Sequence, residues 1–95
     1  MEKDSLTSLE DAILALKTRE EVTRFFQDLC TPKEWQALQE RWRVCQLLSQ
    51  GTLSYRNIHD QTGVSLTTIA RVARFLNQEK AQGYKLVLSR LLTKG

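Results

Sequence analysis

The sequence predicts an all-α fold of six short helices, and three observations support it. Glycine occurs only four times and proline once in 95 residues, so few breaks interrupt the chain. Apolar residues recur at intervals of three and four, which is the period of an amphipathic helix. No segment makes a credible strand. The length suits one domain, so we expect residues 1–95 to form a single domain.

The first two helices are predicted by apolar spacing and by a capping pattern. A first helix over about residues 7–17 carries Leu9, Ile13 and Leu16. Thr18 lies three residues before Glu21, which is the spacing of a capping box, so a second helix begins there. The apolar side of this second helix is formed by Val22, Phe25, Phe26 and Leu29.

The segment "TPKE" predicts the start of a third and longer helix. Thr31 can cap it, Pro32 suits its first turn, and Glu34 completes a capping box. Gly51 ends it at a C′ position, so the helix covers about residues 32–50. Its wide apolar side predicts contacts with more than one other helix. That side consists of Trp35, Leu38, Trp42, Val44, Cys45, Leu47 and Leu48.

Residues 54–76 have the pattern of a helix-turn-helix. Ser54 can cap a short helix to about Thr62, Gly63 turns the chain, and Ser65 can cap a second helix to about Leu76. Four apolar side chains can pack between the two helices, namely Ile58, Val64, Ile69 and Val72. A last helix over about residues 82–93 is marked by Tyr84, Val87, Leu88 and Leu91.

Charge is distributed unevenly along the chain. Residues 1–50 contain seven Lys or Arg and nine Asp or Glu, a net charge of −2, whereas residues 51–95 contain seven and two, a net charge of +5. No acidic residue lies between Asp60 and Glu79. A basic carboxyl-terminal half favours a polyanionic partner.

One face of the second helix of the helix-turn-helix fits DNA. Thr67, Arg71 and Arg74 follow one another at i, i+4 and i+7 and so share a narrow arc. Ser65 and Thr68 lie at the amino-terminal tip, where short hydroxyl groups can reach base edges in the major groove. Free backbone N–H groups at such a tip attract phosphate, and no carboxylate is present there to repel it. These residues predict binding to double-stranded DNA.

Two long stretches resemble the Trp repressor superfamily, and most closely its YerC/YecD-type branch. They are "DLCTPKEWQALQERWRVCQLLSQG" and "IHDQTGVSLTTIARVARFLN". The resemblance covers about residues 20–77 well and the two ends more loosely. Its most specific parts are the L-x-T-P-x-E/D-x-x-A-L opening, Arg41, and the T-G-x-S-x-x-T-I-x-R-V segment. The resemblance implies an intertwined homodimer that represses transcription at palindromic operators.

The resemblance also assigns functions to individual positions. Arg56 matches a residue that contacts DNA, and Arg71 matches an arginine between the ligand pocket and the phosphate backbone. His59 and Ala70 replace two phosphate-contacting residues of the family, so contacts to the backbone are expected to be distributed differently. The tip of the recognition helix is matched by Leu66, Thr67 and Thr68.

Tryptophan is not expected to be the corepressor here. By the same resemblance, Arg41 lies across the pocket from Arg71, and the backbone of Thr31 helps to hold the ligand amino group. Val72 and Phe75 stand where tryptophan-responsive members have glycine and serine. Because these two side chains fill the indole slot, we expect no tryptophan binding and no cofactor. Phe75 would then replace the ligand from within.

Two chains are expected to associate. Apolar stripes on nearly every helix exceed what one 95-residue globule can bury. A homodimer would bury the surplus and would separate its two DNA-binding helices by one turn of DNA, about 34 Å.

Other classes of function fit the sequence less well. His59 beside Asp60 suggests a surface residue, while Cys30 and Cys45 fall on apolar stripes, so no catalytic centre is predicted. A single histidine without a CxxC pair also argues against a structural metal. A helical protein-interaction module using the basic face is the main alternative. RNA binding stays open, although no exposed aromatic platform is evident.

The sequence predicts a cytoplasmic protein without a membrane segment. No apolar run approaches the roughly 20 residues that span a bilayer. The amino-terminal sequence "MEKDSLTSLEDA" is too acidic and polar for a signal peptide.

Overall fold

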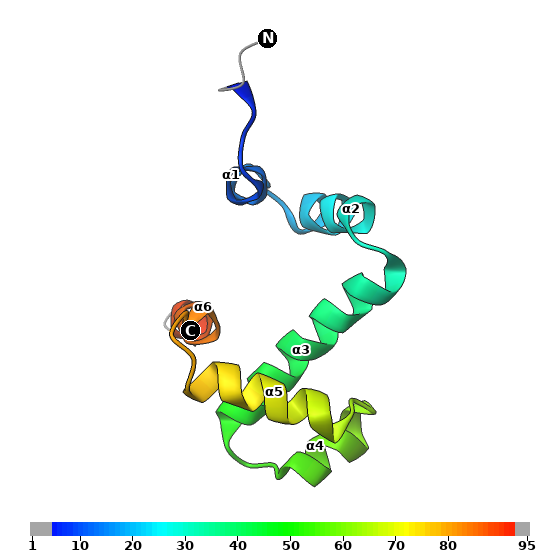
Figure 1. The fold of residues 1–95 in the computed structure, drawn as a ribbon, viewed down its shortest axis with the longest axis vertical. Coiled ribbons are helices and arrows are strands. Elements are labelled where there is room, and N and C mark those ends of the chain that lie inside the picture. The colour runs from blue at the N-terminus through cyan, green and yellow to red at the C-terminus, as the bar shows by residue number, and fades with distance from the viewer. Residues whose placement is uncertain (1–4, 93–95) are drawn as a thin grey trace. The chain divides into compact units, whose positions relative to one another are not determined.

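The computed structural model describes residues 5–92, and these residues form six α-helices and no strand (Figure 1). The all-α prediction is therefore confirmed, and the helices follow in the predicted order. The chain divides into two compact units, residues 1–35 and 36–95, called the N-terminal and the C-terminal unit below. The helices are α1 (Leu9–Leu14), α2 (Arg19–Leu29), α3 (Pro32–Gln50), α4 (Tyr55–Thr62), α5 (Leu66–Asn77) and α6 (Gly83–Leu92).

The first helix is shorter than the sequence predicts. It begins after Ser8, whose Oγ accepts a hydrogen bond from the backbone N–H of Asp11, and it contains six residues rather than the predicted span of about 7–17. It ends early because residues of the following connection make hydrogen bonds to the first turn of α2. The backbone N–H of Lys17 donates to Glu21 Oε1 at 2.7 Å, and Thr18 Oγ1 accepts from the backbone N–H of Glu21 at 3.1 Å.

Neither α1 nor α2 contains a buried residue. The rings of Phe25 and Phe26 meet edge to face at 5.6 Å, and Phe26 stacks on Trp35 at 5.3 Å between centroids. Other apolar side chains lie exposed, including Leu14 at 81% and Leu29 at 51%. Over its described residues, 5–35, the N-terminal unit thus has an aromatic cluster but no buried core.

The ends of α3 confirm the prediction made from "TPKE". The backbone N–H of Thr31 donates to Glu34 Oε1 at 2.8 Å, and Thr31 Oγ1 accepts from the backbone N–H of Glu34 at 3.1 Å. At the other end Gly51 has φ 75°, a left-handed conformation that suits glycine. In the C-terminal half of the helix, Val44 and Cys45 are completely buried.

The core of the C-terminal unit lies where α3, α4, α5 and α6 contribute apolar side chains. The predicted packing between the two helices of the helix-turn-helix is confirmed, since all four residues proposed for it are buried. Helices α4 and α5 contact each other, and α5 also contacts α6. The buried cluster is Val44, Cys45, Ile58, Val64, Ile69, Val72 and Leu76, with Trp42, Leu47, Leu48, Leu53, Tyr84 and Leu88 packed against it.

Residues 5–92 contain neither a candidate membrane-spanning helix nor a cluster of candidate metal ligands. No helix in this range is long and apolar enough to cross a membrane. Within the same range, no group of three or more His, Cys, Asp or Glu side chains is placed to hold a metal ion.

Candidate nucleic-acid interface

The turn between α4 and α5 is held by a small set of hydrogen bonds. Gly63 has φ 76°, and its N–H donates to the carbonyl of His59 at 2.8 Å. Thr62 Oγ1 donates to the carbonyl of Ile58 at 2.7 Å and accepts from the N–H of Val64 at 3.1 Å. His59 Nδ1 lies 2.8 Å from the carbonyl oxygen of Val64, and because a carbonyl only accepts, Nδ1 is the donor. These bonds set the angle at which α5 leaves the turn.

His59 therefore has a structural contact that the sequence does not indicate. The sequence suggested only a surface side chain that replaces a phosphate contact. No local pattern indicates this bond, because it depends on how Gly63 folds the chain back toward α4. The side chain is half-buried and belongs to the turn.

Helix α5 begins with a hydroxyl cap and without acidic residues in its first turn. Ser65 Oγ accepts a hydrogen bond from the backbone N–H of Thr68 at 3.1 Å and donates to Thr68 Oγ1 at 3.1 Å. The hydroxyls of Ser65 and Thr68 are thus engaged with each other, and Thr68 is half-buried. Thr67 and Leu66, by contrast, are exposed at the tip. The positive end of the helix dipole points outward there without an acidic side chain to offset it.

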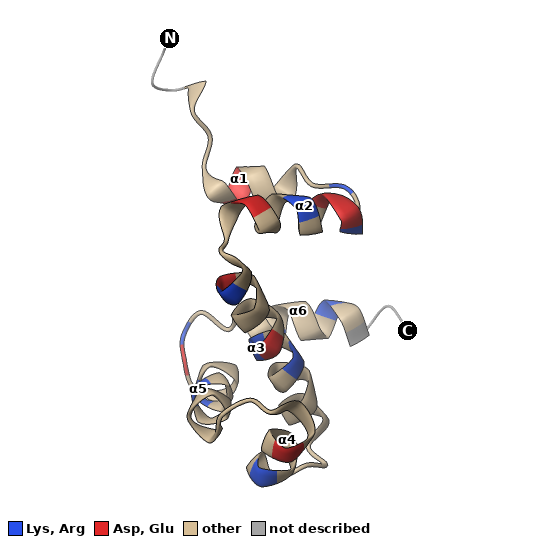
Figure 2. Cartoon of the chain, turned by 90° about the vertical axis from the view of Figure 1, so that its right-hand side faces the viewer, with Lys and Arg blue, Asp and Glu red and all other residues tan. Residues whose placement is uncertain are grey.

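The two faces of α5 differ sharply in burial. Ile69, Val72, Ala73 and Leu76 are buried, whereas the opposite face exposes Thr67, Ala70, Arg71 and Arg74. The arc predicted from the i, i+4, i+7 spacing is therefore exposed. Arg56 is also exposed, in the first turn of α4, where Figure 2 shows the basic residue of that helix.

Both arginines of α5 have partners within the chain. The guanidinium carbon of Arg71 lies 4.4 Å from the centroid of the Phe75 ring, and that of Arg74 lies 5.2 Å from it. Arg74 Nε also lies 3.4 Å from Glu79 Oε2, and the two side chains are 55% and 41% exposed. An exposed ion pair of this kind stabilises a fold by no more than about 1 kcal/mol. Arg74 can therefore leave Glu79 for a phosphate at small cost.

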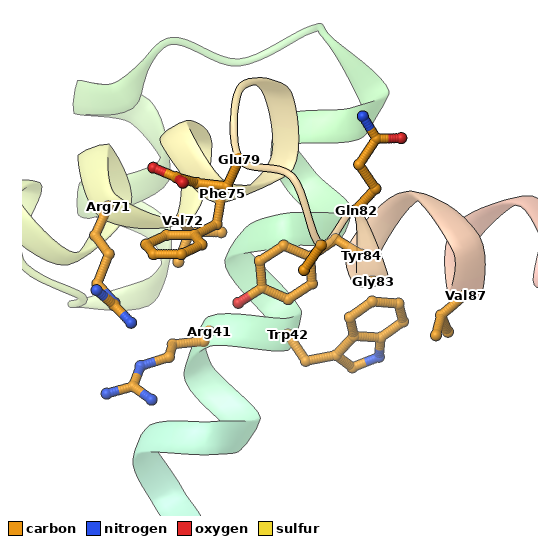
Figure 3. A pocket seen from close by; sticks show the side chains of 11 residues that line it. Arg41, Trp42, Arg71, Val72, Phe75, Glu79, Gln82, Gly83, Tyr84 and Val87 are labelled. Carbon is orange, nitrogen blue, oxygen red and sulfur yellow. The ribbon is translucent and has the colours of Figure 1, made fainter.

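A cavity of about 510 Å³ lies beside the exposed face of α5, within the C-terminal unit (Figure 3). It brings together four of the residues that the resemblance assigned to the ligand pocket, Arg41, Arg71, Val72 and Phe75. The fifth, Thr31, belongs to the N-terminal unit and is not part of this cavity.

Two aromatic residues that mark helices in the sequence, Trp42 and Tyr84, also line this cavity. Tyr84 stacks on Trp42 with 6.5 Å between ring centroids. Burial raises the pKa of the Tyr84 hydroxyl, as does the neighbouring Cys45, while the positive charges of Arg41 and Arg71 act in the opposite direction. Tyr84 therefore stays a neutral phenol near physiological pH. The sequence shows the aromatic positions but not that α6 brings one of them to the arginines.

Comparisons with known proteins agree on one family. The family model described as Trp repressor protein matches residues 4–92. The chain is 43% identical over 86 residues to the uncharacterized protein YerC of Bacillus subtilis (strain 168), covering 90% of this chain and 81% of that protein. None of these names describes an enzyme.

Two solved structures are also similar. The crystal structure of a TrpR-like protein from Eubacterium eligens ATCC 27750 matches with a TM-score of 0.80 and 41% identity, over 87% of this chain and 84% of that one. A putative Trp repressor from Staphylococcus aureus matches with a TM-score of 0.80 and 38% identity, over 96% and 94% of the two chains. The chain therefore belongs to the Trp repressor family.

Proposed function

We propose that this protein is a sequence-specific DNA-binding regulator of transcription, and that it acts as a repressor. The observation that carries the proposal is the exposed face of α5, which presents Thr67, Arg71 and Arg74 beside a helix tip without acidic residues. Membership of the Trp repressor family supports the same conclusion. A cytoplasmic location is part of the proposal, because the operator lies there.

The exposed residues divide into two groups by the chemistry they can perform. Thr67, with Leu66 and Thr68 beside it, contacts base edges, because short side chains at the tip of a recognition helix fit the major groove. Arg56, Arg71 and Arg74 contact phosphates on either side of the groove. Ser65 contributes mainly by capping, which aims the backbone N–H groups of the tip at a phosphate.

The functional unit in this proposal is a homodimer in which residues 1–95 of each chain form one domain. The support is apolar surface that a single chain leaves uncovered on α1, α2 and α6, for example Leu9 at 51% and Leu91 at 52% exposed. A second copy supplies apolar surface of the same kind. Two-fold symmetry would then present two α5 helices to a palindromic operator, about 34 Å apart.

DNA binding in this proposal does not require tryptophan. Val72 is 1% exposed, so its side chain occupies core volume beside Arg71. Phe75 places an aromatic ring against the Arg71 guanidinium at 4.4 Å, where the resemblance places the ligand. Isothermal titration calorimetry with L-tryptophan should therefore show no binding at micromolar concentrations, and a micromolar affinity would contradict this part.

Fluorescence anisotropy with mixed genomic DNA fragments, at several salt concentrations, tests the central proposal. Binding should weaken steeply with salt, because phosphate contacts release counterions. Arg71→Ala should weaken binding to all fragments and lower the salt slope by about one. Lys85→Ala removes the same charge from α6 and serves as the matched control, with an unchanged slope.

The tip of α5 needs a separate test. Thr67→Ala should change the preference among bound fragments more than the average affinity, because Thr67 is assigned to bases. Sequencing fragments selected by the wild-type protein and by this variant gives both quantities, together with the half-site and its spacing. A uniform loss of affinity would remove the assignment of Thr67 to bases.

The alternative function is a protein-interaction module that uses the same basic face. It predicts that genomic DNA does not bind, or binds without salt dependence. Either result in the anisotropy experiment would replace the proposed function with this one.

A further inference from the structure

We infer that Phe75 is a positioning residue for DNA binding: its ring holds the guanidinium groups of Arg71 and Arg74 in place before DNA arrives. The inference rests on the proposed function, because it explains how the phosphate-contacting side chains of that function are oriented. It concerns a residue that itself need not touch DNA.

The geometry places one ring against two cations. Arg71 and Phe75 are four residues apart on α5 and thus lie on neighbouring turns of one face. Their guanidinium-to-ring distance is 4.4 Å, and that of Arg74 is 5.2 Å. Both values fall within the range of about 6 Å in which a cation is attracted to the face of an aromatic ring. Figure 3 shows Arg71 extending alongside the Phe75 ring.

A stacked guanidinium remains able to bind phosphate. The ring attracts the flat face of the group, whereas the N–H donors lie in its plane and point away from the ring. Both interactions can therefore form together. A free arginine side chain samples many rotamers and loses this freedom when it binds. Because the ring restricts the rotamers in advance, less entropy is lost on binding and affinity rises.

The position of Phe75 in the fold supports a role beyond filling the core. The neighbouring residues Val72 and Leu76 are buried, while Phe75 is only half-buried at the edge of the core. One part of its ring surface is thus left for the arginines.

The first test compares two substitutions at Phe75. Phe75→Leu keeps an apolar side chain but removes the aromatic face, and it should weaken binding to all DNA fragments by roughly three- to tenfold, because the two arginine side chains then lose more rotamer freedom on binding. The salt slope should stay as in wild type, because both arginines remain to contact phosphate. Phe75→Tyr keeps the ring and should restore wild-type affinity. Thermal melting of both variants checks that they are folded.

A double-mutant cycle shows whether Phe75 acts through the arginines. In an Arg71→Ala/Arg74→Ala protein, adding Phe75→Leu should cause no further loss of affinity. An equal fold-loss in both backgrounds would overturn the inference, and so would wild-type affinity in Phe75→Leu.

A measurement without DNA separates this inference from the proposed function. In the NMR spectrum of the free protein, ring currents should shift the side-chain signals of Arg71 and Arg74 upfield in wild type and in Phe75→Tyr. These shifts should vanish in Phe75→Leu. Random-coil chemical shifts for Arg71 and Arg74 in the wild-type protein would refute the positioning role even if DNA binds. Clear shifts together with absent DNA binding would leave the geometry standing and refute the DNA-binding function, and with it the role assigned to Phe75.

Discussion

The two units of the chain have the same kind of helix caps but differ in burial and in net charge. The N-terminal unit, residues 1–35, carries five Lys or Arg and eight Asp or Glu, a net charge of −3, and its helices bury no side chain. The C-terminal unit, residues 36–95, carries nine and three, a net charge of +6, and contains the core. Hydroxyl caps start helices in both units. Capping therefore decides where a helix begins, but it does not provide the burial that stabilises a fold.

The opposite net charges of the two units and their exposed apolar side chains suggest how two chains would associate. The N-terminal unit of one chain is suited to cover apolar surface of a second copy, with its negative charge toward a positive partner.

Truncation in the core should have the largest effect. Ile69→Ala removes buried methyl and methylene groups from α5, where the side chain is 0% exposed, and should lower the free energy of unfolding by about 2–5 kcal/mol. Leu66→Ala on the same helix is the control, because Leu66 is 42% exposed and should cost less than about 1 kcal/mol. Urea denaturation measures both values. Equal losses would show that the core is not concentrated where the structure places it.

A charge on the apolar side of α2 should break the proposed dimer. Leu29 is 51% exposed in the single chain, so Leu29→Glu costs little within one chain but prevents apolar contact with a second. Sedimentation at micromolar concentration should change from dimer to monomer, and DNA affinity should fall at least about tenfold, as expected when one of two half-sites is lost. Gln27→Glu introduces the same charge on the same helix at an exposed polar position and should remain dimeric. A monomeric wild-type protein would contradict the dimer itself.

The two thiols should differ in reactivity. Burial raises the pKa of the Cys45 thiol in the C-terminal unit from 9.0 to about 11, so almost no thiolate forms there at pH 8. Cys30 in the N-terminal unit is half-buried. A disulfide reagent at pH 8 should therefore modify Cys30 at least about ten times faster than Cys45. Cys30→Ser should leave only the slow phase, and a fast phase in that variant would contradict the burial of Cys45.

The raised pKa of Cys45 also predicts how the stability of the fold changes with pH. The folded state keeps the Cys45 proton up to a higher pH than the unfolded chain does. Its contribution to stability is therefore constant below pH 9.0 and falls as pH rises from 9.0 towards about 11. Relative to a Cys45→Ala protein, wild type should lose thermal stability over this interval.

The helix caps should matter in only one unit. Ser65 and Ser8 each accept a hydrogen bond from the backbone N–H three residues later. Ser65→Ala should lower the free energy of unfolding by about 1 kcal/mol, because α5 carries four core residues. Ser8→Ala should have less than half this effect, because it loosens a six-residue helix without buried side chains. Equal losses in thermal melts would mean that α1 is coupled to the core.

Removing one carboxylate from the basic unit should give the smallest effect. Glu79 pairs with Arg74 at 3.4 Å and competes with phosphate for it. Glu79→Gln should strengthen DNA binding by about twofold, in line with the small energy of an exposed ion pair. Asp28→Asn removes the same charge from the N-terminal unit and should leave DNA affinity unchanged. Weaker binding by Glu79→Gln would identify Glu79 as a group that orients Arg74.

Predictions from the sequence succeeded where short-range patterns decide the structure. The capping box at Thr31 and Glu34, the turn at Gly63 and the buried Ile69 all follow from residues within one or two turns. The length of α1 was wrong because apolar spacing continues to Leu16, while Lys17 donates its backbone N–H to the next helix. Periodicity alone cannot show such competition between adjacent helices.

The candidate site could be predicted only in part. The exposed arc of Thr67, Arg71 and Arg74 follows from helical geometry, since the opposite face is apolar. The ion pair between Arg74 and Glu79 requires the chain to turn after α5, and no pattern in the sequence specifies that turn. The proximity of Tyr84 to Trp42 likewise depends on how α6 packs.

The sequence alone is enough to predict six helices, the apolar face of each and the basic half of the chain, because helix formation and side-chain periodicity act over a few residues. It also predicts four of the N-caps, namely Thr18, Thr31, Ser54 and Ser65. The tertiary structure decided which faces are covered within one chain and which are not. It also opens a cavity beside Phe75 that is lined by residues of α3, α5 and α6. Both depend on contacts between helices, whose geometry is set by the packing of many side chains together.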